Sequence, residues 1–178
     1  MKATGMTRRI DELGRVVIPK EIRRTYNLNV GDELEIYTEA DGVLVMRKHS
    51  RMLVVSDIVS GVAEAVWRTT GGTILVTDSE RVIATSGMYR MVYEDAGRSQ
   101  EVHDVLSRRR GMVLRGDMRI PIADESESVT AEVMYVVPIM SGGDIYGSII
   151  ALVDDADVDI VTTVVDTAAS FLALNIGK

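Results

Sequence analysis

Apolar and polar residues follow two different periods along the chain. Between Glu33 and Thr38 they alternate strictly, as on a half-buried strand. Asp41 and Gly42 then form a strong hairpin signal that leads into a partner strand over Val43–Met46. From Val55 onward the apolar residues recur at helical spacing instead. The change of period predicts a small strand-rich segment followed by a larger mixed domain.

The residues before Glu33 also predict short elements. Met6–Ile10 and Arg15–Ile18 are two short strands by composition, joined by a turn in which Gly14 can adopt a positive φ. Pro19 presets the backbone for a helix of barely two turns over Lys20–Tyr26. The order of elements in this segment is β-β-α-β-β.

The larger domain begins with an amphipathic helix that Gly71 and Gly72 end, and Trp67 is expected to be buried there. Ser99 is expected to cap a second helix that runs to Arg110. A third helix starts near Asp157. The predicted strands are Thr73–Thr77, Val82–Ser86, Met112–Leu114, Ala131–Met140 and Ile145–Val153. The order α-β-β-α-β-β-β-α indicates one sheet flanked by helices.

These patterns give an α+β chain with two domains, residues 1–50 and residues 52–178. Four short strands cannot enclose an adequate core, because small domains bury too little surface. The chain contains no cysteine, so neither a disulfide nor a Cys-based metal site can compensate. We therefore expect the first domain to fold as a dimer.

Charge is distributed unevenly along the chain, which bears on function. Residues 1–30 contain seven basic and three acidic side chains, a net of +4 in a chain whose net charge is −7. The remaining residues therefore carry −11, so the sequence predicts a basic contact surface attached to an acidic body. The N-terminus lacks the apolar core of a signal peptide, and no apolar run approaches ~20 residues. We expect a soluble cytoplasmic protein without a membrane contact.

The segment Thr4–Ile36 resembles the DNA-binding domain of the AbrB family of bacterial transition-state regulators. The resemblance rests on Gly14 and Arg15 at a strand start, a pair of arginines at a helix end and a basic pair before the turn. It implies a swapped-hairpin β-barrel in which two chains interleave. It also implies that the basic side chains contact double-stranded DNA. The protein would then be associated with the nucleoid. The candidate DNA-binding residues are Arg8, Arg9, Arg15, Arg23, Arg24 and Lys2.

Arginine suits this role because its planar guanidinium can hold a phosphate or a guanine edge in two hydrogen bonds. The basic cluster alone is only suggestive, since such residues are also found as solvated surface charge. The family resemblance implies recognition through DNA shape and deformability more than through a strict base code.

The residues from about Met52 to Lys178 resemble a GAF domain in the order of their elements. The cyclic-nucleotide signature of some GAF domains is missing, and without cysteine no bilin can be attached. The sequence indicates no cofactor or metal, although an unknown small ligand remains open. The resemblance further implies that this domain assembles two dimers into a homotetramer.

Enzymatic activity finds little support in the sequence. His49 and His103 are the two histidines, and neither has a nucleophile and an orienting group beside it. The acidic run from Asp124 to Glu127 is expected to be a solvated loop. Arg108–Arg110 would end a helix, where cations are favourable, and a second DNA contact there is a minority interpretation.

Two function classes remain, beside a third and weaker one, a ligand-sensing module with incidental basic charge that would not bind DNA. The first, which the resemblance implies, is a transcription regulator of sporulation (forespore) genes, activating or repressing, with a regulatory second domain. The second is an antitoxin that neutralises a toxin partner, since related swapped-hairpin proteins do so. An antitoxin tail should be short, polar and weakly patterned, whereas this second half is long, apolar and periodic, so the regulator is favoured.

Overall fold

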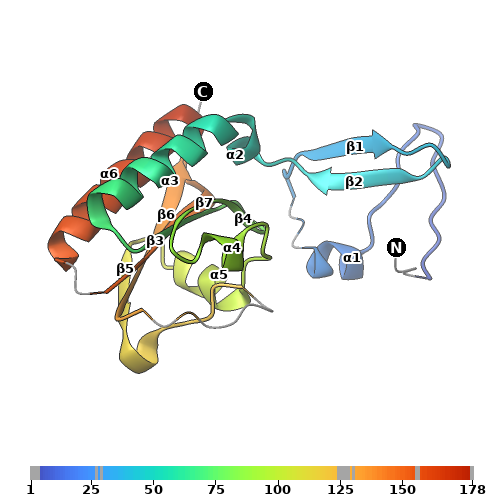
Figure 1. The fold of residues 1–178 in the computed structure, drawn as a ribbon. Helices are drawn as coiled ribbons and strands as arrows, with labels where there is room; N and C mark the ends of the chain where they lie inside the picture. Colours follow the sequence, from blue (N-terminus) through green and yellow to red (C-terminus); the bar gives the residue numbers. More distant parts are fainter. Residues whose placement is uncertain are drawn as a thin grey trace. The chain divides into compact units, whose positions relative to one another are not determined.

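The computed structural model describes residues 5–26, 28, 30–123, 129, 131–154 and 157–176. The chain divides into two compact units, Met1–His49 and Ser50–Lys178, which we call unit 1 and unit 2 (Figure 1).

Unit 1 contains one short helix and one antiparallel ribbon. Helix α1 covers Lys20–Thr25, strand β1 Leu34–Thr38 and strand β2 Leu44–Lys48. Ile36 lies directly opposite Met46 in the ribbon. The backbone N–H of His49 donates to the carbonyl of Glu33 at 2.9 Å, so the ladder runs to the last residue of the unit. The sequence prediction of a helix and a hairpin here is confirmed, with bounds shifted by one or two residues.

The prediction of two strands upstream, at Met6–Ile10 and Arg15–Ile18, is wrong for the single chain. Residues 5–11 and 15–19 carry no strand assignment, although the turn between them forms. The backbone N–H of Asp11 donates to the carbonyl of Arg15 at 3.0 Å, and no further rung of a ladder follows in the described residues. A strand needs a neighbour that pairs with it along its length, and two short arms in one chain do not provide it.

Unit 1 has no hydrophobic core of its own in the residues described. No side chain of residues 5–26, 28 or 30–49 is classed as buried. Ile36 and Leu44, on the same face of the ribbon, are 66% and 67% exposed. Apolar surface of this kind favours association with another surface.

Unit 2 is built on a five-stranded antiparallel sheet in the order β4-β3-β7-β6-β5. Its strands are β3 (Thr73–Thr77), β4 (Val82–Gly87), β5 (Met112–Arg115), β6 (Val133–Ser141) and β7 (Asp144–Val153). Its helices are α2 (Arg51–Val54), α3 (Ser56–Thr70), α4 (Arg90–Tyr93), α5 (Gln100–Leu106) and α6 (Val158–Ile176), with the 3-10 turn η1 at Gly116–Met118.

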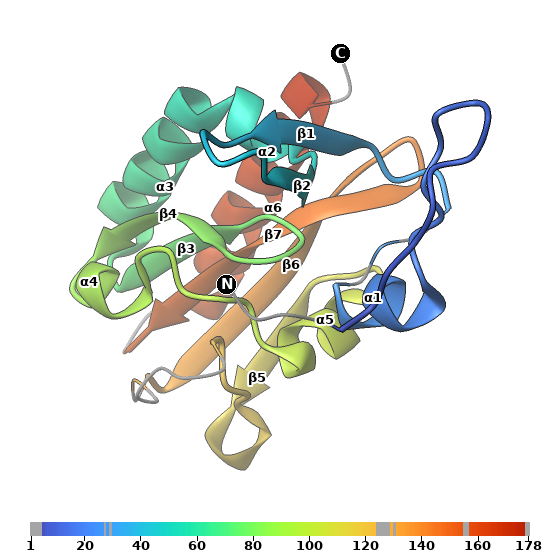
Figure 2. The same ribbon diagram turned by 90° about the vertical axis from the view of Figure 1, so that its right-hand side faces the viewer.

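The sheet is covered on both faces (Figure 2). Helices α3 and α6 pack on one face, where Val59, Val165 and Leu172 meet Ile74 and its neighbours. Helices α4 and α5 pack on the other face, where Tyr93 and Val102 belong to a second cluster. Alternate residues of the central strands β3, β6 and β7 enter opposite clusters, as the period of a strand requires.

Close backbone approach explains one glycine of the sheet. A Cβ placed on Gly147 of β7 would lie 1.9 Å from the carbonyl oxygen of Thr77 in β3. Only glycine allows these two backbones to come so near, so residue 147 is fixed by packing and not by turn geometry.

The strands, the three main helices and the cap at Ser99 in unit 2 are confirmed. The Ser99 hydroxyl accepts the N–H of Val102 at 3.2 Å, as an N-cap should. The expected run of this helix to Arg110 is wrong, because α5 ends at Leu106 and Arg109 has a φ of +58°. The helix is capped at Ser107, whose N–H donates to the carbonyl of His103 at 3.0 Å, and the left-handed Arg109 follows two residues later.

Two smaller differences concern apolar residues. The sequence predicts a buried Trp67, yet 36% of it is exposed, since α3 turns Val59, Ala63 and Val66 toward the sheet. The short helices α2 and α4 do not follow from the sequence pattern. Four residues carry too little periodicity to mark a helix in a sequence.

Helix α6 is long and apolar enough to cross a membrane by length and composition, the one described helix of which this holds. In unit 2 it packs against the sheet through Val161, Val165 and Leu172. Asp157 begins it, accepting the N–H groups of Asp159 and Ile160 at 3.0 and 3.4 Å. The packing accounts for the apolar side of the helix without a membrane.

Candidate nucleic-acid interface

The candidate interface begins with the tight turn from Asp11 to Arg15. The N–H of Gly14 donates to the carbonyl of Asp11 at 2.9 Å, and Gly14 has a φ of +75°. One carboxylate oxygen of Asp11 accepts the N–H groups of Leu13 and Arg15 at 3.0 and 2.8 Å. The turn is therefore fixed by an aspartate at its start and a glycine near its end.

Asp11 also holds the side chain of Arg15. Nε of Arg15 donates to the second carboxylate oxygen at 2.8 Å. Hydrogen bonds from the backbone N–H of Arg15, then from its guanidinium and from Leu13, keep the pKa of the Asp11 carboxyl below its usual range. Both side chains are exposed, so the ion pair orients the arginine more than it stabilises the fold. The sequence places Asp11 at the start of this turn, but its contact with the Arg15 side chain was not predicted.

Arg8 and Arg9 lie on the arm that enters this turn. Both are exposed, and the Arg8 guanidinium donates to the carbonyl of Thr7 at 2.9 Å. The hairpin thus places Arg8 and Arg9 on one arm and Arg15 at the start of the other. Lys2 lies outside the described residues.

Arg23 and Arg24 lie in the last turn of α1, as predicted. The helix starts after Pro19, whose carbonyl accepts the N–H of Arg23 at 2.9 Å. Consecutive helical residues point about 100° apart, so the two guanidinium groups leave the helix in different directions. Arg23 is half-buried and Arg24 is exposed.

The charge of this segment is mostly uncompensated. Among the described residues, Arg8, Arg9, Arg23 and Arg24 form no ion pair, and Arg15 pairs only with Asp11. Within the described residues, no hydrogen bond joins the arginines around the Asp11–Arg15 turn to the arginines of α1. Free guanidinium groups on a surface are suited to binding phosphate.

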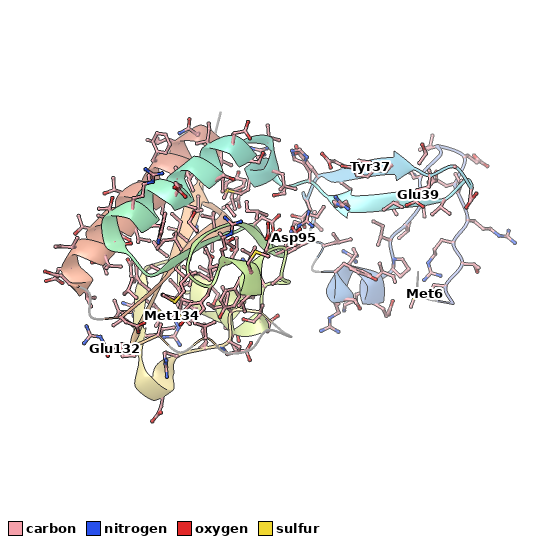
Figure 3. All side chains as sticks on the ribbon, viewed as in Figure 1. Met6, Tyr37, Glu39, Asp95, Glu132 and Met134 are labelled. Carbon is pink, nitrogen blue, oxygen red and sulfur yellow. The ribbon has the colours of Figure 1, made fainter. Side chains whose placement is uncertain are left out.

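The β1–β2 ribbon has a polar face around Tyr37, which is labelled in Figure 3, and the sequence did not predict the contacts made there. His49 Nδ1 lies 2.7 Å from Glu35 Oε1, and the Tyr37 hydroxyl donates to the other oxygen of Glu35. The Arg47 guanidinium lies 5.8 Å from the centre of the Tyr37 ring. Hydrogen bonds from Tyr37 and then His49 lower the pKa of Glu35. The network makes this face polar, while Ile36 and Met46 make the opposite face apolar.

A metal site finds no basis in the described residues, which contain no cluster of three His, Asp or Glu side chains suited to one. The acidic run from Asp124 to Glu127 lies outside them. His103 has Arg98 as its neighbour at 3.5 Å instead of a nucleophile.

Comparison with protein families gives two matches. Residues 55–177 match the family described as stage V sporulation protein T C-terminal, transcription factor. Residues 7–53 match the family described as antidote-toxin recognition MazE, bacterial antitoxin.

Comparison with individual proteins gives relatives of both units. The chain is similar to stage V sporulation protein T of Bacillus subtilis, with 36% identity over 97% of each chain. It is also similar to the transition state regulatory protein AbrB of the same organism, with 34% identity over 47% of this chain and 88% of that protein. A solved GAF domain/HD domain protein from Geobacter sulfurreducens superimposes with a TM-score of 0.53 at 12% identity, covering 68% of this chain and 91% of that one.

The structural likeness concerns the fold of unit 2. It establishes the GAF-type arrangement of a sheet between helices that the order of elements predicted. The match to AbrB covers most of that protein and supports the AbrB-type assignment of the N-terminal segment.

Proposed function

The chain belongs to the family of stage V sporulation protein T, and we propose that it regulates transcription in sporulating cells by binding double-stranded DNA through unit 1. The family is a transcription-factor family, and the likeness to a sporulation protein covers almost the whole chain. We propose a non-enzymatic regulator that acts on the chromosome, as activator or repressor, and this membership supports the proposal.

The observation that carries the DNA contact is the free charge of unit 1. Arg8, Arg9, Arg23 and Arg24 have no carboxylate partner among the described residues, and Arg15 is oriented by the turn. Phosphate contacts position a protein on DNA, and Arg is the side chain that makes them in pairs of hydrogen bonds. We assign these five arginines, with Lys2, to the DNA contact.

A dimer completes unit 1 in this proposal. The apolar face of the β1–β2 ribbon, with Ile36 opposite Met46, has no cover within unit 1. Burying that face against a second copy would supply the missing core, and the unpaired arms on either side of the Asp11–Arg15 turn would find partners in the other chain. A two-fold axis would then present each arginine twice, which suits the pseudo-symmetric surface of a duplex.

Unit 2 is proposed to join two such dimers into a homotetramer. Helices α3 and α6 contact each other and leave Ile58, Phe171 and Leu174 exposed on the outer layer of the unit. Exposed apolar side chains on adjacent helices are typical of a helix-to-helix contact between subunits. Such a tetramer would hold two DNA-binding surfaces together and raise affinity through avidity.

The antitoxin alternative is supported by the match of residues 7–53 to the MazE family. That match covers the DNA-binding segment and not the part that would bind a toxin. In place of a short polar tail, residues 55–177 match a transcription-factor domain and fold around a five-stranded sheet. The regulator is therefore the function that the chain supports best.

Replacing single arginines tests this proposal. Arg15→Ala and Arg23→Ala should each weaken binding of a labelled A·T-rich duplex by about 1–3 kcal/mol, which is roughly 5-fold to 150-fold. Arg47→Ala is the matched control, because Arg47 lies on the polar face of β2 beside Tyr37 and outside the basic segment. Equal affinity of all three variants would show that the arginines of the turn and of α1 are ordinary surface charge.

A further inference from the structure

The strand β5 forms an outer edge of the sheet in unit 2. The sheet ends with β5 on one side, and β5 pairs only with β6, from Met112 opposite Val136 to Arg115 opposite Val133 (Figure 2). Successive residues of an antiparallel strand direct their backbone groups alternately toward and away from the partner, so half of those of β5 face outward. Within the described residues no backbone or side-chain group hydrogen-bonds to this outer side.

The other edge of the sheet is different. Next to β4, the N–H of Val82 donates to the carbonyl of Ala96 at 2.9 Å, and Arg81 forms a bridge with Gly97. The β4 edge is thus partly covered by the chain itself, which leaves β5 as the more open edge.

The open edge is flanked by arginines. Residues 107–119 contain five arginines and one aspartate, a net of +4, inside a unit with eleven basic and nineteen acidic side chains. The five are Arg108, Arg109, Arg110, Arg115 and Arg119, all exposed. The unit as a whole carries −8, so this concentration of positive charge is local.

Two of these arginines have structural roles and three do not. Arg109, held at a φ of +58°, donates to the carbonyl of Gly143 in the β6–β7 hairpin, and Arg119 donates to the carbonyls of Gly116 and Ala131. The side chains of Arg108, Arg110 and Arg115 form no hydrogen bond or ion pair in the part of the chain that the structure describes. Arg110 precedes β5 and Arg115 ends it, so free guanidinium groups lie at both ends of the edge.

We propose that the β5 edge, with Arg108, Arg110 and Arg115, is a docking site for an extended acidic segment of a partner protein. Such a segment would add to the sheet as a sixth strand, with backbone hydrogen bonds to β5 and carboxylates paired to the arginines. The edge offers four residues, so the contact is weak and depends on its charges.

Charge argues against two other partners for this edge, a second copy of the chain and a DNA duplex. A second copy of β5, paired antiparallel, would bring Arg115 of each chain beside the arginine at the opposite end, and like charges across strands are unfavourable. A DNA duplex extends well past a four-residue strand and would meet the acidic surface next to it. Glu132, labelled in Figure 3, directly precedes Val133, the partner of Arg115, and its backbone N–H donates to a carboxylate oxygen of Asp154 at 2.6 Å. A narrow peptide can contact the edge alone.

The test measures binding of fluorescein-labelled eight-residue peptides to the full chain by anisotropy. A saturating A·T-rich duplex is added first, to occupy the basic surface of unit 1. The probes are a peptide alternating Glu with Val, the same peptide with Gln for Glu, and a peptide of equal charge with two Val replaced by Pro. Proline removes the N–H groups that an added strand needs, without changing the charge.

We expect the Glu–Val peptide to bind and the Gln–Val and Pro-containing peptides to bind at least ~10-fold more weakly. Arg110→Glu combined with Arg115→Glu should also weaken the Glu–Val peptide at least ~10-fold, with an unchanged thermal transition. Arg90→Glu is the control, since Arg90 is an exposed arginine of α4, which packs beside β4.

Three results would overturn the proposal. They are no binding of the Glu–Val peptide at about 1 mM, equal binding of the Pro-containing peptide, or an equal loss in Arg90→Glu. If the double variant instead lowers duplex affinity and flattens its salt dependence, the edge contacts DNA and the peptide assignment is wrong. The comparison of the double variant with Arg90→Glu assigns the peptide to the β5 edge even if the duplex leaves unit 1 free, because all three substituted arginines lie in unit 2.

Discussion

The apolar face of the β1–β2 ribbon gives the sharpest prediction for unit 1. Ile36 and Tyr37 are neighbours in β1 whose side chains lie on opposite faces, because side chains alternate along a strand. If the Ile36 face is the core of a dimer, Ile36→Ser should weaken assembly. Tyr37→Ser, on the polar face beside Glu35, should leave assembly nearly unchanged.

The expected loss of dimer stability follows from the exposed fraction of the Ile36 side chain. Ile36 is 66% exposed in the single chain, so about two thirds of its side chain is available for burial in a dimer. Full burial of an Ile side chain contributes about 1.5–3 kcal/mol, so Ile36 contributes about 1–2 kcal/mol per chain and about 2–4 kcal/mol per two-fold dimer. At 1.4 kcal/mol per factor of ten, the dimer dissociation constant should rise roughly 30-fold to 700-fold. A residual cavity would add to this loss.

Sedimentation equilibrium of the full chain over a concentration series measures this change. Wild type and Tyr37→Ser should show the same association constants, while Ile36→Ser should lose one association step and any contact through unit 2 should persist. Duplex affinity should fall with it, since the two-fold arrangement of arginines depends on the dimer. Indistinguishable association of Ile36→Ser and Tyr37→Ser would refute the assignment of this face to a dimer core.

Three further changes test the local geometry. Asp11→Asn keeps an acceptor for the turn but removes the ion pair with Arg15, so duplex affinity should rise about 2-fold to 5-fold; a fall would mean that the carboxylate is needed to shape the turn. Burial and a hydrogen bond raise the pKa of Tyr135 above its ordinary value of 10.0, so its stabilising effect is complete below pH 10 and lost as the pH rises further. Tyr135→Phe should therefore cost about 1 kcal/mol in urea unfolding at neutral pH and less above pH 10, and a constant difference across that range would contradict the linkage. Gly147→Ala should destabilise unit 2 by about 1–3 kcal/mol or more, whereas Gly97→Ala, with open space around the added Cβ, should not, and equal thermal transitions of the two would show that the strands can move apart.

Much of unit 2 could be predicted from the sequence because its elements are long and periodic. The helical spacing of Val161, Val165 and Leu172 marks them as one stripe in the sequence alone, and all three are buried against the sheet. The order of the strands in the sheet was not predictable in this way. It depends on which edges meet in three dimensions, and the neighbours β3 and β7 are far apart in the sequence.

The end of α5 shows a limit of local signals. The sequence predicts that this helix runs to Arg110 and ends in the three cations Arg108–Arg110. The helix ends at Leu106, and beyond it Arg109 takes the left-handed conformation and donates to the β6–β7 hairpin, more than thirty residues away along the chain. Local propensity placed the boundary four residues too late, since it does not register the tertiary contacts of the residues that follow the helix.

Unit 1 shows the opposite case, in which the sequence predicts strands that a single chain does not form. The arms around Asp11 and Arg15 have strand composition, but a single chain offers them no partner. The candidate DNA-binding residues could be chosen from charge and family resemblance, whereas Asp11 could not, because its role depends on the geometry of the turn. Their contact with DNA stays a prediction.

The measurement that tests the central proposal most directly is the salt dependence of duplex binding. Anisotropy of a labelled A·T-rich duplex would be recorded with the full chain across a series of salt concentrations. If the arginines of a two-fold unit 1 neutralise several phosphates, the slope of log affinity against log salt should be steeper than about −4. No binding at low salt, or a slope near zero, would contradict the assignment of unit 1 to DNA.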